Sequence, residues 1–167
     1  MGYTNYYMGY TNYYRVPIIM DKEKFKTLSE ELHTISGMLP YSKSAGCKSK
    51  ESIVLCGGDG TGNPEFTEDT ICFNGDESKG LSHETFGFDR NNTRRATIVG
   101  SRNGLVFDFC KTARKPYNLM VQLSMLRLKH HFPECEISSD GNYEDWKQAR
   151  ALYKRFFKIN APKLDKG

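Results

Sequence analysis

The chain has 167 residues, of which 38% are hydrophobic and 13% aromatic, and its formal net charge is +4. This length and composition are typical of one globular domain with an apolar core, and no apolar run approaches the roughly 20 residues that a transmembrane helix needs. The five cysteines form no Cys-x-x-Cys pair and match no zinc-ligand spacing, so we expect free thiols, no metal site and a cytoplasmic location.

The chain begins with a perfect tandem repeat, because residues 1–7 and 8–14 are identical. A unit this short is not a solenoid repeat. We interpret Met8 as the natural start and residues 1–7 as a duplicated leader or a cloning scar, with a genuine recent duplication as the alternative. A single globular domain is predicted over residues 8–158, followed by a flexible tail at 159–167.

The first half of the domain predicts strands around one helix. Residues 10–19 alternate enough to form a first strand, with Pro17 at an edge or near its end. Asp21 is a suitable N-cap for a helix that ends near Gly37. The apolar face of this helix consists of Phe25, Leu28, Leu32 and Ile35. Further short strands are predicted at residues 52–56, 69–74 and 84–89.

The second half predicts a basic connector at residues 91–102 and the central strand at 104–110. The helix expected at residues 116–131 is apolar nearly all round, so it is buried or lies in an oligomer interface, and we expect a homo-oligomer. A strand at residues 135–138 precedes a third helix, whose first turn contains Glu144 and Asp145. The predicted fold class is α+β, a single domain with a mixed, mostly antiparallel sheet and about three helices.

The segment 107–117 predicts a buried strand, a basic loop and a helix N-terminus, where free backbone N–H groups attract anions. The chain places Lys111, Thr112, Arg114 and Lys115 at this position. Residues 90–115 hold seven basic residues and one acid, a net charge of +6, which leaves about −2 for the rest of the chain. The pattern favours an anionic ligand over the simpler alternative, a solvated basic loop.

Other residues could complete such a site. Tyr13 or Tyr14 and Trp146 offer aromatic faces on which a base could stack. His83 and Asp140 could donate or accept hydrogen bonds. The glycine-rich residues 57–62 lack the lysine of a phosphate-binding loop and the helix of a dinucleotide-binding fingerprint, so no cofactor is predicted.

Two residues raise the alternative of an enzyme. Cys110 lies beside Lys111 near the expected helix N-terminus, and both neighbours would lower a thiol pKa. His83 precedes Glu84 and could act as a general base, although adjacent strand residues point to opposite faces. The simpler interpretations are a buried structural cysteine and a solvent-facing histidine. We therefore favour a binding protein over an enzyme that acts on a phosphorylated or ADP-ribosyl-type substrate.

Five segments carry a resemblance to a known family: residues 8–14, 58–60, 83–84, 109–117 and 138–146. They are similar to the Met-Gly-Tyr-Thr-His-Tyr-aromatic strand, the Gly-Asp-Gly loop, the His-Glu pair, the Phe-Cys-Lys-Thr-Ala-Arg-Lys-Pro-Tyr block and the Ser-Ser-Asp-Gly turn of a family of small bacteriophage and bacterial proteins. Asn12 stands where the family pattern has His, which argues against an acid–base or metal role there. The resemblance implies a phage-type origin and a role in the encounter with the host, in whose cytoplasm the protein would act.

We therefore predict a phage-type host-interaction protein that binds an anionic, nucleotide-like small molecule in a basic pocket. In that setting it would sequester a host immune signal. The second alternative is an inhibitor that binds a host protein or a nucleic acid through the basic segment 90–102. No membrane partner is predicted.

Overall fold

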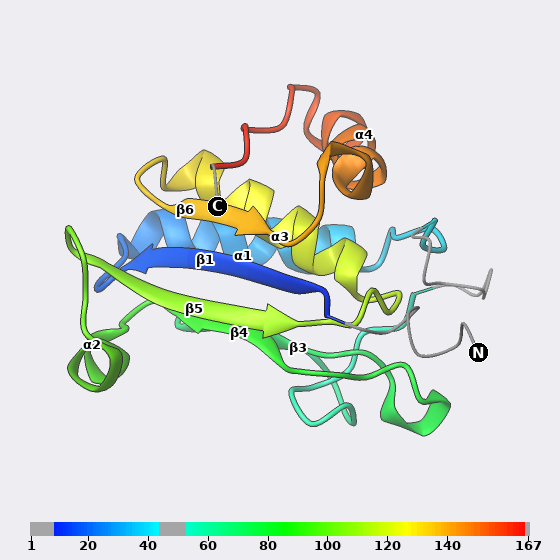
Figure 1. Cartoon of the computed structure of the whole chain (residues 1–167), viewed down its shortest axis with the longest axis horizontal. Coiled ribbons are helices and arrows are strands. Elements are labelled where there is room, and N and C mark those ends of the chain that lie inside the picture. The colour runs from blue at the N-terminus through cyan, green and yellow to red at the C-terminus, as the bar shows by residue number, and fades with distance from the viewer. Residues whose placement is uncertain (1–8, 44–52, 166–167) are drawn as a thin grey trace.

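Two small antiparallel sheets and four α-helices make up residues 9–43 and 53–165, the part of the chain that the computed structural model describes (Figure 1). The duplicated leader predicted at residues 1–7 and the last two residues of the predicted tail lie outside this part. The fold class is α+β, as predicted, with one helix more than the three expected and with two sheets in place of one.

The first sheet has the strand order β5-β1-β6. β1 (Thr11–Pro17) pairs antiparallel with β5 (Leu105–Lys111) on one side and with β6 (Glu136–Ser139) on the other. The central strand is therefore β1, and the strand predicted at 104–110 to be central is the edge strand β5. This order depends on pairing between strands that lie some 90 residues or more apart in the sequence, and strand propensity alone does not predict such pairing.

The second sheet consists of β2 (Glu65–Phe66), β3 (Thr70–Phe73) and β4 (Phe86–Asp89). It does not continue the first sheet, because β4 packs its aromatic side chains onto the inner face of β1. The ring centroids of Phe86 and Phe88 lie 5.2 and 6.3 Å from that of Tyr14. The strand predicted at 52–56 is reduced, over its described residues, to one bridge between Cys56 and Asn74. A short 3-10 helix, η2 (Glu77–Lys79), precedes β4.

Helix α1 (Lys22–Ser36) begins and ends where local signals predict. The Asp21 side chain accepts a hydrogen bond from the Lys24 backbone N at 3.0 Å, and Gly37 follows the last turn. Helix α2 (Thr93–Val99), by contrast, falls in the segment predicted to be a polar, basic connector. It has no side-chain N-cap bond and no buried residue, so neither capping nor apolar periodicity marks it in the sequence.

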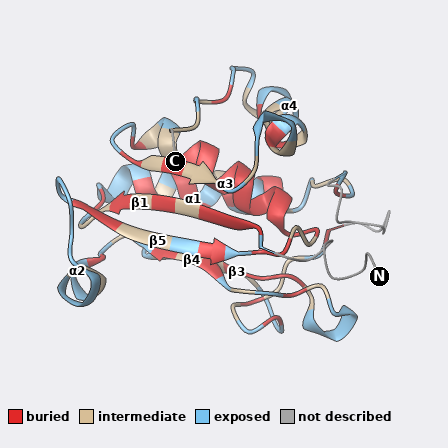
Figure 2. Ribbon diagram, in the orientation of Figure 1, coloured by how far each residue is buried: buried red, intermediate tan, exposed pale blue. Residues whose placement is uncertain are grey.

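Helix α3 (Asn118–His131) is buried around its whole circumference over residues 118–128, as the apolar pattern predicts. Figure 2 shows this helix largely buried and α2 exposed. α3 packs against α1, α4 (Lys147–Phe157), β1 and β6 of the same chain. Its apolar surface is therefore covered within one chain, which removes the argument that the sequence offered for an oligomer.

The chain after α4 returns to β6 at the end of the described residues (Figure 1). The Asp165 side chain accepts hydrogen bonds from the Ile137 backbone N at 2.8 Å and from Lys129 Nζ at 2.7 Å. The Asp165 backbone N donates to Ile137 O at 2.8 Å. The flexible tail predicted at 159–167 thus includes a segment that is bonded to the sheet.

Candidate functional site

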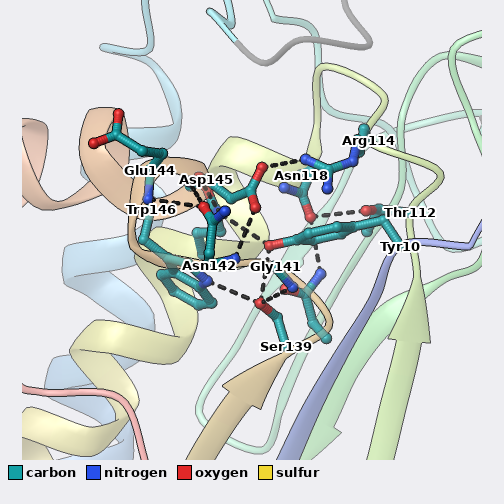
Figure 3. A network of polar contacts seen from close by, with 12 residues as sticks. Tyr10, Thr112, Arg114, Asn118, Ser139, Gly141, Asn142, Glu144, Asp145 and Trp146 are labelled. Atoms are coloured by element: carbon teal, nitrogen blue, oxygen red, sulfur yellow. Dashed lines mark hydrogen bonds and ion pairs between the residues drawn. The ribbon is translucent and has the colours of Figure 1, made fainter. Parts of the chain in front are cut away.

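Several motif segments of the sequence meet at one end of the first sheet, where β1 begins and β5 and β6 end (Figure 3). Ser139 Oγ lies at the centre. The hydroxyl of Tyr10 donates to it at 3.0 Å, the indole N–H of Trp146 at 2.9 Å and the Gly141 backbone N at 3.1 Å. These bonds join the residue before β1 to the turn after β6 and to the short 3-10 helix η3 (Tyr143–Trp146). The Ser-Ser-Asp-Gly turn is therefore a structural junction.

Arg114 belongs to the same junction. Its guanidinium forms an ion pair with Asp145 and lies 4.4 Å from the centroid of the Tyr10 ring. Ala113 and Arg114 have φ values of 51° and 56°, a conformation that non-glycine residues adopt rarely. The loop is thus turned so that Arg114 points to Asp145 (Figure 3).

The predicted anion ligands at the start of α3 are engaged within the protein. Thr112 is buried, and its hydroxyl donates to Asn118 Oδ1 at 2.7 Å. Lys115 Nζ donates to the carbonyls of Gly80 and Ser82 at 3.0 and 2.7 Å. The backbone N–H groups of residues 118–120 donate to the carbonyls of residues 115–117. Thr112, Lys115 and the N–H groups of residues 118–120 are therefore already paired within the protein.

The two candidate catalytic residues lie close to β5 but differ in exposure. Cys110 is fully buried, and burial raises the pKa of its thiol to about 12, whereas its neighbours were expected to lower that pKa. His83 is exposed, with Nδ1 at 2.8 Å from Lys111 O. The Glu84 carboxylate accepts from the Lys111 backbone N at 2.8 Å, so both side chains bond the backbone of Lys111. A thiol without exposed surface and with a raised pKa is a poor nucleophile.

Two of the predicted base-stacking residues are in the core. Trp146 is fully buried, and Tyr14 is 1% exposed with its hydroxyl bonded to Gly87 O at 2.9 Å. Neither offers a face to a ligand, which corrects the prediction for both. Tyr13 is the next residue along β1 and therefore points to the opposite, outer face of the sheet.

The outer face of the β5-β1-β6 sheet carries three aromatic rings, which we call the aromatic row: Tyr13, Phe107 and Phe109. The Phe107 centroid lies 6.3 Å from that of Tyr13, with the ring planes 22° apart, and 6.1 Å from that of Phe109. Tyr13 lies opposite Phe109 in the register of β1 and β5. Phe109 is 41% exposed, and Figure 2 shows the middle of β5 as half-buried to exposed.

Basic side chains border the aromatic row at both ends. At one end the Arg15 guanidinium lies 5.0 Å from the Phe107 centroid, and Arg15 and Arg102 both contact Glu136 Oε2, at 3.3 and 3.1 Å. At the other end Lys111 Nζ lies 5.9 Å from the Phe109 centroid. A shallow hollow of about 670 Å³ covers part of this face. Its lining includes Tyr13, Arg15, Arg102, Phe107, Glu136 and Ser138.

Asp140 positions Tyr13 in this row. Its Oδ1 accepts the Tyr13 hydroxyl at 2.8 Å and its Oδ2 accepts the Thr11 backbone N at 2.9 Å. The hydrogen bond to Asp140 raises the pKa of the Tyr13 hydroxyl. Of the predicted site residues, Tyr13, Asp140 and Lys111 therefore meet on the outer face.

Sequence reasoning missed Arg15, Phe107 and Phe109 as site residues. A signal for them was present, because Phe107, Phe109 and Lys111 are spaced by two along one strand and so share a face. Tyr13 and Arg15 have the same spacing on the neighbouring strand. The pattern alone did not say which face of the sheet is covered by the rest of the chain.

The chain matches no protein-family model, no curated protein and no solved structure. Within residues 9–43 and 53–165, no helix is long and apolar enough to cross a membrane. In the same described residues, no three His, Cys, Asp or Glu side chains come together as metal ligands would. The side chains of the outer face are therefore the basis for assigning a function.

Proposed function

We propose that this protein binds an anionic, nucleotide-like ligand on the outer face of the β5-β1-β6 sheet. The observation that carries the proposal is the accessible aromatic row, which has basic side chains at both ends. Every nucleobase has a flat π face, and stacking on an aromatic side chain contributes about 1–3 kcal/mol per base. The ligand's base would lie on Phe107 or Phe109, and its phosphate beside a cation at the end of the row.

The arginines suit a phosphate because a guanidinium presents planar pairs of N–H donors. Arg15 and Arg102 share a single carboxylate, that of Glu136. Asp165 also lines the hollow but is paired with Lys129, so these side chains together keep one net positive charge. The Arg102 side chain is 62% exposed and can therefore turn toward a ligand without unfolding its surroundings. This supports an anion at the Arg15 end of the row.

We keep the predicted ligand class and propose the outer face of the sheet as its site, in place of the start of α3. In the phage setting that the resemblance implies, such binding would sequester a nucleotide signal of the host. The inhibitor alternative has weaker support, because Arg90 and Arg95 of the basic segment pair with Asp69 and Asp108 at 3.1 and 3.0 Å. The enzyme alternative would rest on His83, since Cys110 is buried.

The test is calorimetric titration of the purified protein with a panel of AMP, ATP, a cyclic dinucleotide and short oligonucleotides. We expect at least one of these to bind, and Phe107→Ala to weaken that binding about 5- to 150-fold, the equivalent of 1–3 kcal/mol. Tyr143→Ala is the matched control, because Tyr143 is 67% exposed in η3 and lies outside the aromatic row. Absence of binding across the whole panel would contradict the proposal.

A further inference from the structure

We infer that the ligand is a linear, single-stranded oligonucleotide segment, which lies along β5 and places successive bases on the aromatic row. This inference rests on the proposed function and goes further by naming the ligand class. It comes from the spacing of the rings and from the positions of the basic side chains at the two ends of the row.

The ring spacing fits one base per ring. Neighbouring centroids in the row lie 6.1 and 6.3 Å apart. Bases stacked on one another are only about 3.4 Å apart. Bases that occupy neighbouring rings are therefore unstacked from each other, which a single strand permits and a duplex does not.

The two cations contact different rings, Arg15 that of Phe107 and Lys111 that of Phe109. Arg15 lies opposite Phe107, and Lys111 follows Phe107 by four residues on β5. At about 3.4 Å per strand residue, the backbone positions of the two cations are about 14 Å apart along the strand. A mononucleotide carries its phosphates on one side of one base and so reaches one end. A chain of two to four nucleotides reaches both.

The positions of the cations set the axis along which the ligand lies. Arg15 and Arg102 lie at the Phe107 end of the row, where both contact Glu136. Lys111 lies at the Phe109 end. A phosphate backbone that contacts cations at both ends therefore runs along β5.

Glu136 limits the affinity of this site. Its Oε2 contacts the guanidinium groups of both Arg15 and Arg102, so a phosphate has to compete with it. Glu136→Gln removes the competing charge while keeping the shape of the side chain. We expect this variant to bind a given oligonucleotide more tightly than the unmodified protein does.

The experiment is a titration, followed by fluorescence anisotropy or calorimetry, with thymidine monophosphate, dT2, dT4, dT8 and an eight-base-pair duplex. We expect affinity to rise steeply from the monophosphate to dT4, and the duplex to bind more weakly than dT8. Phe109→Ala should weaken dT4 binding about 5- to 150-fold, and Tyr143→Ala should not. Circular dichroism establishes that each variant is folded.

The salt dependence tests the second basic end. With two or three phosphate contacts, the slope of log K against log salt is roughly −1.4 to −2.1 for a single strand. Lys111→Gln should reduce the magnitude of this slope by about 0.7, because one phosphate contact is lost. Lys147→Gln is the matched control, because the Lys147 side chain is 71% exposed at the start of α4 and its loss should leave the slope unchanged.

The outcomes separate this inference from the proposed function. If thymidine monophosphate and dT4 bind with equal affinity, and Phe107→Ala weakens both, the inference of an oligonucleotide ligand is wrong and the proposed nucleotide-binding site stands. Tighter binding of a cyclic dinucleotide than of dT4, or equal affinity for the duplex and dT8, would also overturn a linear single strand. If no nucleotide or oligonucleotide binds, both the oligonucleotide inference and the proposed function are wrong.

Discussion

The Tyr13 hydroxyl donates a hydrogen bond to Asp140 Oδ1 at 2.8 Å, and this bond holds the Tyr13 ring beside that of Phe107. Asp140 in turn is fixed by the Thr11 backbone N. The Ser-Ser-Asp-Gly turn therefore stabilises the end of the sheet and also orients one ring of the aromatic row. A structural motif and the candidate ligand surface share this residue.

The first prediction separates the ring of Tyr13 from its hydroxyl. Tyr13→Ala removes a stacking surface and should weaken nucleotide binding about 5- to 150-fold. Tyr13→Phe keeps the ring and should retain most of the affinity. Calorimetric titration of both variants with the tightest-binding nucleotide is the measurement. An equal loss in the two variants would show that the hydroxyl, and not the ring, contributes the affinity.

The second prediction concerns thiol reactivity. Burial raises the pKa of the Cys110 thiol to about 12 and also raises that of Cys135, and both side chains are fully buried. Cys56 and Cys72 are partly exposed. Iodoacetamide at pH 8 should therefore label Cys56 and Cys72 well before Cys110 and Cys135, as measured by peptide mass spectrometry.

Urea-unfolded protein is the control, in which all cysteines should react at similar rates. Labelling of Cys110 as fast as Cys56 in the native protein would mean that this thiol is accessible. That result would return Cys110 to consideration as a nucleophile.

The third prediction tests the packing of the turn after β6. A Cβ atom on Gly141 would lie 2.5 Å from Asp145 Oδ2 and 2.7 Å from Tyr10 Cε2. Gly141→Ala should therefore destabilise the protein by about 1–3 kcal/mol, the usual cost of overpacking. At Gly37 the nearest atom would be 3.7 Å away, and φ is −84°. Gly37→Ala is the matched control and should be neutral or stabilise by up to about 1 kcal/mol.

Urea denaturation of the two variants gives both free energies of unfolding. If Gly141→Ala is as stable as the unmodified protein, the turn is not packed against Tyr10 and Asp145. The junction at the sheet end would then be looser than its hydrogen bonds indicate.

The fourth prediction concerns acid stability and the carboxylate that joins α1 to α3. Glu31 Oε2 accepts from Arg127 Nε at 2.8 Å, and its Oε1 pairs with His131 Nε2 at 2.5 Å. Burial alone would raise the pKa of Glu31, but the hydrogen bonds from His131 and Arg127 outweigh it and hold the pKa below its ordinary 4.5. The unfolded state therefore binds this proton more readily than the folded state does.

Because the folded pKa is lowered, the contribution of the Glu31 charge to stability is fully present above pH 4.5 and is lost as the pH falls through the folded pKa. The unmodified protein should lose stability on acidification in that range more steeply than Glu31→Gln. Urea denaturation of both at pH 6 and pH 3 measures the difference. Parallel losses in the two proteins would contradict a lowered Glu31 pKa.

Much of the secondary structure could be predicted, because its signals are local. Asp21 caps α1, Gly37 ends it, and apolar residues spaced by three or four, from Phe25 to Leu32, mark its buried face. The apolar residues of α3 likewise predict a buried helix. Helix α2 could not be found this way, since it has neither a side-chain cap nor a buried face.

The site was harder to predict because faces and partners are not local properties. Alternation along β1 requires Tyr13 and Tyr14 to point in opposite directions, but it does not say which of them is covered. That was decided by β4, whose Phe86 packs against Tyr14 and leaves Tyr13 outside. The partners of the basic loop could not be predicted for the same reason. Only folding brings Asp145 to Arg114, and the carbonyls of Gly80 and Ser82 to Lys115.

The sequence by itself therefore determined an α+β chain with well-marked helices, alternating strands and a cluster of positive charge. The tertiary structure alone decided that β1 is central, that the cations of the loop after β5 are largely paired, and that the accessible aromatic rings lie on the outer face of the first sheet. The physical reason is that propensity and capping act over a few residues, whereas burial and charge pairing depend on contacts between residues far apart in the chain.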